Sequence, residues 1–100
     1  MTVRHIVTWK LSGESIADRD AQAAEIIAVL EPLNGRIDGL QSLKLYRNTL
    51  NHEANWDLTL ESVHDDAEAL AVYAAHPEHL AAVEIVKQRT VGRACVDFVE

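Results

Sequence analysis

The stretch Tyr73-Ala74-Ala75-His76-Pro77-Glu78-His79-Leu80 decides how the second half of this chain folds. Proline has no backbone N–H and clashes with the preceding helical turn, yet it fits the first turn of a new helix. We therefore expect one helix to end near His76 and a second helix to begin at Pro77. Both residues are assigned a structural role, in which His76 caps the second helix or forms a hydrogen bond across the break.

The same junction brings together two side chains that can take part in chemistry. His79 falls in the first turn of the second helix, where the positive end of the helix dipole disfavours a charged imidazole. A neutral ring that can accept a proton is the expected state at neutral pH. Tyr73 lies one turn before the break, so the sequence predicts a small polar cluster flanked by alanine and leucine.

Hydrophobic alternation and helical spacing predict the other elements outward from this junction. Strands are expected over residues 3–11, 40–48, 56–63 and 91–99. A first helix is expected over residues 16–31, opened by a Ser15–Asp18 pair that resembles a capping box. The order β-α-β-β-α-β predicts one α+β domain, residues 1–100, with the ferredoxin-like arrangement and an antiparallel sheet.

The alternation assigns two faces to each strand. On the first strand, the more apolar face holds Val3, His5, Val7, Trp9 and Leu11. On the third strand it holds Trp56, Leu58 and Leu60. On the last strand the apolar side holds Ala94, Val96 and Phe98, and the opposite side holds Arg93, Cys95 and Asp97.

Helices cover only one face of such a sheet, so the other face meets water or a second sheet. Ile6, Thr8, Thr59 and Val63 make that face less polar than a solvated face requires. We therefore expect a homodimer in which two sheets pack face to face.

Composition excludes several classes of partner. Nine Lys and Arg against sixteen Asp and Glu give a net charge of -7, which repels nucleic acid and anionic membranes. No apolar run approaches the roughly 20 residues that span a bilayer, and the N-terminus lacks the features of a secretory leader. The single Cys95 cannot form an internal disulfide, so a cytoplasmic location is expected.

Four segments together resemble the stress-responsive α/β-barrel domain family, often called Dabb. They are Val3-Arg4-His5-Ile6-Val7, Asn55-Trp56-Asp57-Leu58, Tyr73 with His76-Pro77-Glu78-His79, and Arg93-Ala94 followed by Val96-Asp97-Phe98. The resemblance covers essentially the whole chain. It implies a ferredoxin-like subunit, a homodimer that forms a dimeric α/β barrel, and a pocket between sheet and helices in each subunit.

One branch of this family is a polyketide cyclase that makes olivetolic acid, and resemblance to it implies catalytic roles for His5, Tyr73 and His79. The residues expected to line the substrate pocket beside them are Val7, Trp9, Leu60 and Leu80. A neutral imidazole can remove a proton from a carbon between two carbonyls, and a phenol can hold the enolate oxygen. The function expected is binding of a small carbonyl-rich molecule, with cyclisation or isomerisation and no cofactor.

Three alternatives stay open at this point. The pocket can bind a ligand without turnover. The chain can be a non-enzymatic stress-responsive or structural homodimer whose histidines stiffen the helix junction. Other dimeric α/β barrels suggest, by analogy alone, a cofactor-free monooxygenase.

The remaining polar residues are given structural roles. His76 and His79 lack a third ligand at a convincing spacing, so no metal site is predicted. Asp57 and Asp97 are expected to form ion pairs with Arg4, Arg47 or Arg93, and Cys95 to be inert. His52 and His64 lie in or next to polar turns, so both are expected to be exposed to solvent.

Overall fold

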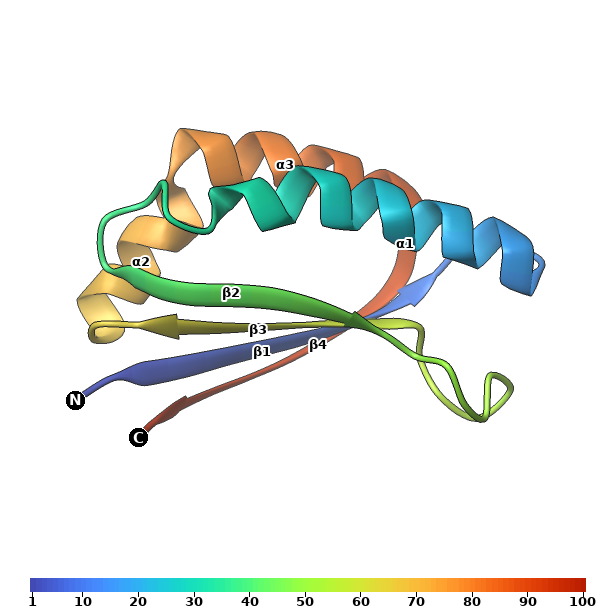
Figure 1. Ribbon diagram of the computed structural model, residues 1–100, viewed down its shortest axis with the longest axis horizontal. Coiled ribbons are helices and arrows are strands. Elements are labelled where there is room, and N and C mark those ends of the chain that lie inside the picture. The colour runs from blue at the N-terminus through green and yellow to red at the C-terminus, as the bar shows by residue number, and fades with distance from the viewer.

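The computed structural model describes residues 1–100 and contains a four-stranded antiparallel sheet with order β2-β3-β1-β4. The elements in chain order are β1 (Val3–Leu11), α1 (Ile16–Leu30), the 3-10 helix η1 (Glu31–Leu33), β2 (Leu40–Arg47), β3 (Leu58–His64), α2 (Ala67–Ala75), α3 (Pro77–Arg89) and β4 (Thr90–Val99). The helices lie on one side of the sheet, and its other face is left open (Figure 1). The predicted ferredoxin-like fold is confirmed.

Side-chain caps fix where each helix begins. The Ser15 hydroxyl accepts a hydrogen bond from the Asp18 N–H at 3.0 Å, and the Asp66 carboxylate accepts one from Ala69 at 2.8 Å. At the third helix, His76 Nδ1 accepts from the Glu78 N–H at 3.1 Å. With Pro77 in the first position, this cap separates α2 from α3 by a single residue.

The third strand begins two residues later than the alternation predicted. Asp57 precedes it, and its carboxylate accepts a hydrogen bond from Leu11 N at 2.8 Å and lies 3.3 Å from Arg19. The expected pairing of Asp57 with Arg4, Arg47 or Arg93 is therefore wrong, because α1 supplies the nearer cation. The Trp56 ring lies against Gly92 instead of joining Leu58 in the core, which corrects the face assigned to it.

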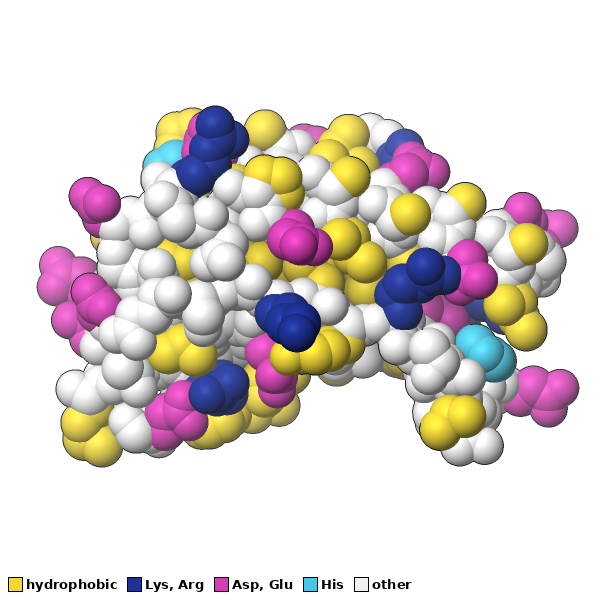
Figure 2. Space-filling view, viewed as in Figure 1, with side chains coloured by type: hydrophobic (Ala, Val, Ile, Leu, Met, Phe, Trp, Pro, Cys, Tyr) yellow, Lys and Arg dark blue, Asp and Glu magenta, His cyan; other side chains and the backbone are white.

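The core fills the space between the sheet and the helices. Its most deeply buried side chains include Ile26 and Leu30 from α1 and Leu58 and Leu60 from β3, each no more than 2% exposed. In the space-filling view, apolar side chains follow the seam between α1 and the sheet (Figure 2). Burial of these leucines and isoleucines is the main stabilising contribution that fixes the helical layer on the sheet.

The uncovered face of the sheet carries apolar side chains in register. Ile6 on β1 lies opposite Val96 on β4, and Val96 is 61% exposed. Phe98 and Tyr46 are also exposed. Val96 and Phe98 of the edge strand β4 thus add exposed apolar surface to the face on which Ile6 lies.

None of the helices combines the length and the apolar character needed to cross a lipid bilayer.

Truncation of the core tests this packing. Leu58→Ala removes a side chain that is 1% exposed, and we expect it to lower the free energy of unfolding by about 2–5 kcal/mol. Leu50→Ala is the matched control, because Leu50 is 71% exposed, and we expect a change within about 0.5 kcal/mol. Denaturant unfolding measures both. Equal losses in the two variants would contradict the core described.

Candidate active site

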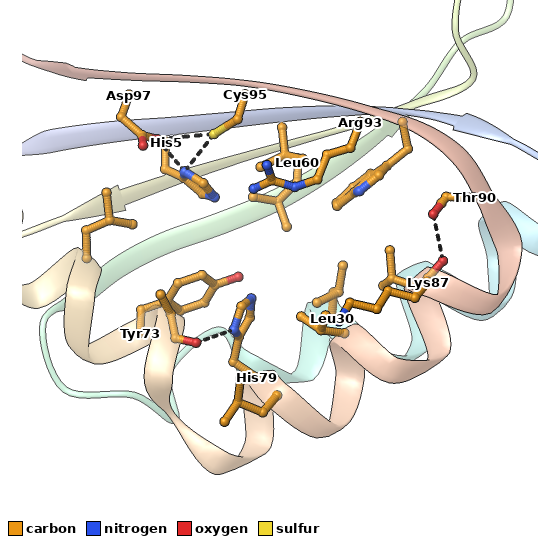
Figure 3. Close-up of a pocket in the computed structure, with 17 residues that line it drawn as sticks. His5, Leu30, Leu60, Tyr73, His79, Lys87, Thr90, Arg93, Cys95 and Asp97 are labelled. Atoms are coloured by element: carbon orange, nitrogen blue, oxygen red, sulfur yellow. Dashed lines mark hydrogen bonds and ion pairs between the residues drawn. The ribbon is translucent and has the colours of Figure 1, made fainter.

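A cavity of about 690 Å³ opens between the helices and the β1 and β4 side of the sheet. Its wall includes every residue that the sequence placed in the pocket, namely His5, Val7, Trp9, Leu60, Tyr73, His79 and Leu80. Two polar groups face each other across it, one from the sheet and one from the junction of α2 and α3 (Figure 3). The wall between them is mostly apolar.

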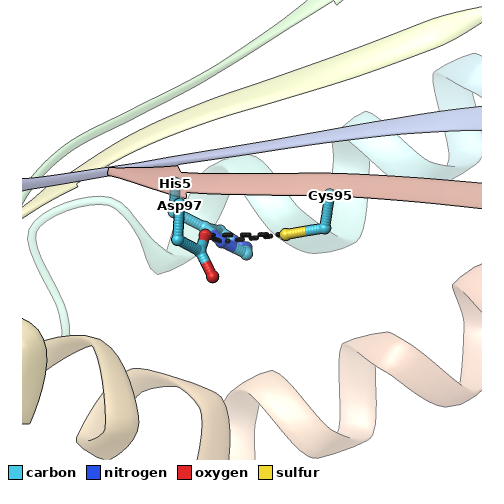
Figure 4. Close-up of side chains that lie close together, drawn as sticks. All are labelled: His5, Cys95 and Asp97. Carbon is cyan, nitrogen blue, oxygen red and sulfur yellow. Dashed lines mark hydrogen bonds and ion pairs between the residues drawn. The ribbon is translucent and has the colours of Figure 1, made fainter.

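On the sheet side, His5 is held by a carboxylate from the neighbouring strand. Antiparallel pairing sets Asp97 of β4 directly opposite His5 of β1, so both side chains project from the same face. The Asp97 carboxylate pairs with His5 Nδ1, and the Cys95 sulfur lies 3.5 Å from each of these two atoms (Figure 4). The expected arginine partner for Asp97 is therefore wrong, as is the placement of Asp97 and Cys95 away from His5.

This pairing leaves the second nitrogen of His5 free. A neutral ring that donates Nδ1–H to Asp97 presents an unprotonated Nε2, and that nitrogen points into the cavity (Figure 3). Partial burial alone would raise the pKa of Asp97, but the hydrogen bond from His5, and the charge of His5 when it is protonated, outweigh burial and lower that pKa. Asp97 thus stays ionised at neutral pH and orients His5 as a proton acceptor.

On the helix side, the rings of Tyr73 and His79 pack against each other in a tilted arrangement, with centroids 4.3 Å apart and planes 43° apart. His79 Nδ1–H donates to the Ala74 carbonyl at 3.0 Å, which leaves its Nε2 as an acceptor. Burial, with smaller effects from the charges of His5 and Arg93, lowers the pKa of His79 despite this hydrogen bond. Burial also raises the pKa of Tyr73 to about 12, so at neutral pH the phenol is a donor and the imidazole is a base.

His64 is a fourth ring in this cluster, which the sequence reading missed. It is fully buried, with its ring centroid 5.0 Å from that of Tyr73 and 6.3 Å from that of His5. The prediction that His64 is exposed is wrong because β3 continues through it, and the alternation from Leu58 and Leu60 points it at the helices. His52 is half-buried in the loop between β2 and β3 and does not line the cavity.

The hydrogen bonds of His64 are incomplete. Its Nε2 is 2.8 Å from the Ser62 hydroxyl, whereas its Nδ1 has no partner. Burial lowers the pKa of His64 below the ordinary 6.5, and the charge of His5, when it is protonated, lowers it further. A neutral His64 therefore packs beside the Tyr73 ring.

One group of side chains has the chemistry to hold a metal ion. His5, Cys95 and Asp97 offer ligand atoms that all lie within 4.8 Å of one another (Figure 4). An ion there would compete with the His5–Asp97 hydrogen bond for the same nitrogen. Burial and the nearby Asp97 charge raise the pKa of the Cys95 thiol, so Cys95 is a thiol at neutral pH and a poor nucleophile.

The family model described as Stress responsive A/B Barrel Domain matches residues 3–100. An uncharacterized protein of Streptomyces coelicolor is 27% identical over 86 residues, which cover 86% of this chain and 88% of the relative. The crystal structure of a dimeric protein of unknown function and ferredoxin-like fold from Bacteroides fragilis has a TM-score of 0.86 at 30% identity, covering 97% of this chain and 94% of that one.

A hydroxynitrile lyase from Passiflora edulis has the same fold. Its TM-score is 0.81, and the match covers 99% of this chain and 93% of that one, at 14% identity. Identity this low indicates shared architecture and carries no activity across to this chain.

The buried His64 predicts how stability depends on pH. In the unfolded chain a histidine takes up a proton near pH 6.5, whereas the folded His64 has a lower pKa. Below pH 6.5 the unfolded state therefore binds more protons, and the free energy of unfolding falls as the pH is lowered. Above that pH this contribution is fully present.

Urea unfolding at several pH values between about 7.5 and about 5.5 measures the effect. We expect His64→Gln to reduce the loss of stability across this range, because glutamine does not titrate. His52→Gln, in the loop between β2 and β3, is the matched control and should keep the wild-type slope. An identical slope in the wild type and His64→Gln would contradict the burial of His64.

Proposed function

This chain belongs to the stress responsive A/B barrel domain family, and we propose that it binds a small carbonyl-rich molecule and moves protons on it without a cofactor. The observation that carries the proposal is the pair of opposed bases in one cavity. His5, held by Asp97, lies on the sheet wall, and His79, packed against Tyr73, lies on the helix wall. Each imidazole has one nitrogen committed to a fixed partner and one nitrogen free.

The proposed chemistry begins at a carbon between two carbonyl groups. Its C–H proton passes to the free Nε2 of His5, while the electron pair of that bond moves onto the neighbouring carbonyl oxygen. The Tyr73 hydroxyl donates a hydrogen bond to this enolate oxygen, and Asp97 balances the positive charge that His5 has gained. Because His79 is neutral at neutral pH, it can serve as the proton acceptor on the opposite wall.

Two outcomes follow from the same enolate. Its carbon can attack another carbonyl carbon of the same molecule, which closes a ring in an aldol-type step, and the new alkoxide takes the proton back from His5. Alternatively, the proton returns to a different carbon, which is isomerisation. The mostly apolar wall would hold a folded substrate and limit the access of water.

A binding protein without turnover is the second candidate, and the same cavity supports it. A purely structural role for the histidines is less well supported, because a scaffold would be expected to fill this space with side chains. The open cavity beside Trp9 and Tyr73 favours a ligand site.

Exchange of the activated CH₂ protons of methyl benzoylacetate with deuterium in D₂O tests the proton transfer by NMR. We expect the wild type to exchange these protons faster than buffer alone does. His5→Ala and His79→Ala should each lower the exchange rate about 10²–10⁴-fold, and Tyr73→Phe should lower it by less. His52→Ala is the control and should exchange like the wild type. Equal exchange in wild-type protein and buffer would rule out proton transfer.

Two further conditions separate this function from its rivals. Exchange should persist under nitrogen, whereas a monooxygenase reaction requires oxygen. It should also persist after treatment with EDTA, because no metal takes part in the proposed steps. Circular dichroism and light scattering of the histidine variants should match the wild type. If both histidine variants lose their fold, the structural role is favoured.

We also propose that two copies associate through the open faces of their sheets. Ile6, Val96 and Phe98 form the apolar part of this face, and the similar protein from Bacteroides fragilis is dimeric. Pairing two such faces would remove this apolar surface from water on both copies. The dimer leaves each cavity on the helix side of its own sheet.

A charge at the centre of the face tests this assembly. Val96→Glu would bury an unpaired carboxylate, and we expect it to weaken the dimer about a hundredfold or more. Val72→Glu on α2 is the matched control, since Val72 is 50% exposed on another surface. Sedimentation at micromolar concentration measures both variants. A monomeric wild type, or an unchanged dimer in Val96→Glu, would contradict the interface.

A further inference from the structure

Arg93 differs from the other arginines of this chain in having no carboxylate partner. Five of its six arginines, Arg4, Arg19, Arg36, Arg47 and Arg89, each pair with a carboxylate. Arg93 has no carboxylate partner, although the chain has sixteen acidic residues and a net charge of -7. It is also the arginine that lines the cavity.

The strand pairing explains why Arg93 is left free. Arg93 lies opposite Trp9 on β1 and projects from the same face as Asp97, four positions along. The Asp97 carboxylate is taken by His5, so the nearest acid on this strand is already engaged. The guanidinium group reaches from β4 into the cavity, between the sheet and the helices (Figure 3).

A second cation stands on the opposite wall. Lys87 of α3 lines the same cavity, and its only carboxylate neighbour is Glu84, at 3.8 Å with both side chains about 70% exposed. Such an exposed pair holds its lysine weakly. The cavity of an acidic protein therefore has positive groups on two walls, whereas its one carboxylate, Asp97, is hydrogen-bonded to His5.

We propose that Arg93, assisted by Lys87, binds a carboxylate on the ligand, so that the substrate class is a 3-oxo carboxylic acid with an apolar tail. The planar guanidinium matches a carboxylate with two parallel N–H donors, which a neutral carbonyl cannot use in the same way. Trp9 and Val86 provide apolar surface for the tail. This inference rests on the proposed function for the identity of the reacting carbon.

With such an acid, Arg93 would also help to form the enolate. In a 3-oxo acid the acidic CH₂ is bonded directly to the carboxylate carbon, and loss of its proton places a second negative charge beside the first. A guanidinium on the carboxylate offsets that repulsion, so the group that binds the anion also lowers the cost of forming the enolate. The ketone oxygen is then left for the Tyr73 hydroxyl.

A matched pair of ligands tests the proposal. Benzoylacetate and methyl benzoylacetate differ in the charge at one end, and titration by NMR gives a dissociation constant for each. We expect the wild type to bind the acid about tenfold or more tightly than the ester, as a charge-assisted hydrogen bond at a partly exposed site would provide. Arg93→Gln should bring this ratio close to one, and Arg93→Lys should retain part of it.

Control variants test whether the preference for the acid depends on where the positive charge lies. Arg47→Gln removes one positive charge at an arginine that pairs with Asp20 outside the cavity, so the wild-type ratio should persist. Lys87→Gln should reduce the ratio by less than Arg93→Gln. Added salt should weaken binding of the acid and leave the ester unaffected.

Equal affinity for acid and ester, binding of neither, or an unchanged ratio in Arg93→Gln would overturn the proposal. Its failure is distinguishable from failure of the proposed function, because the ester undergoes deuterium exchange without a carboxylate. Exchange without a preference for the acid leaves the proton transfer standing and removes the role of Arg93. A preference for the acid without deuterium exchange would support the role of Arg93 and remove the proposed proton transfer.

Discussion

The missing N–H of Pro77 is the constraint on which the site depends. A continuous helix through residues 67–89 would carry Tyr73 and His79 along one straight rod. The break at His76 instead ends α2, and the His76 ring caps α3, so the two helices meet at an angle over the sheet. Tyr73 then packs against His79, and the Ala74 carbonyl at the end of α2 accepts a hydrogen bond from the His79 ring.

Pairing between the first and last strands supplies the other wall of the cavity. Because β4 runs antiparallel at the edge of the sheet, Asp97 meets His5 directly and fixes its tautomer. The edge position leaves β4 uncovered by the helices along most of its length, which keeps the cavity open to solvent there. The Asp97 carboxylate is thus engaged by His5, and Arg93, four residues before it, has no carboxylate partner and can bind an anion.

Local pattern was sufficient to predict the element order and the helix break, whereas the pocket lined by residues from His5 to Leu80 was implied by the family resemblance. It failed at Asp97, Cys95 and Arg93, because the most apolar side of an edge strand was taken as its inward side. In this sheet Val96 and Phe98 face outward, and the polar side of β4 faces the cavity. The burial of His64 was missed for a related reason, since a strand end next to two aspartates resembles a turn.

The central claim is that His5 and His79 serve one ligand. Nuclear Overhauser contacts between bound methyl benzoylacetate and the ring protons of these two histidines test it most directly. The account predicts contacts from a single bound ligand to both imidazoles, and their loss when an excess of benzoylacetate displaces the ester. Contacts to only one of the two rings, or to neither, would contradict it.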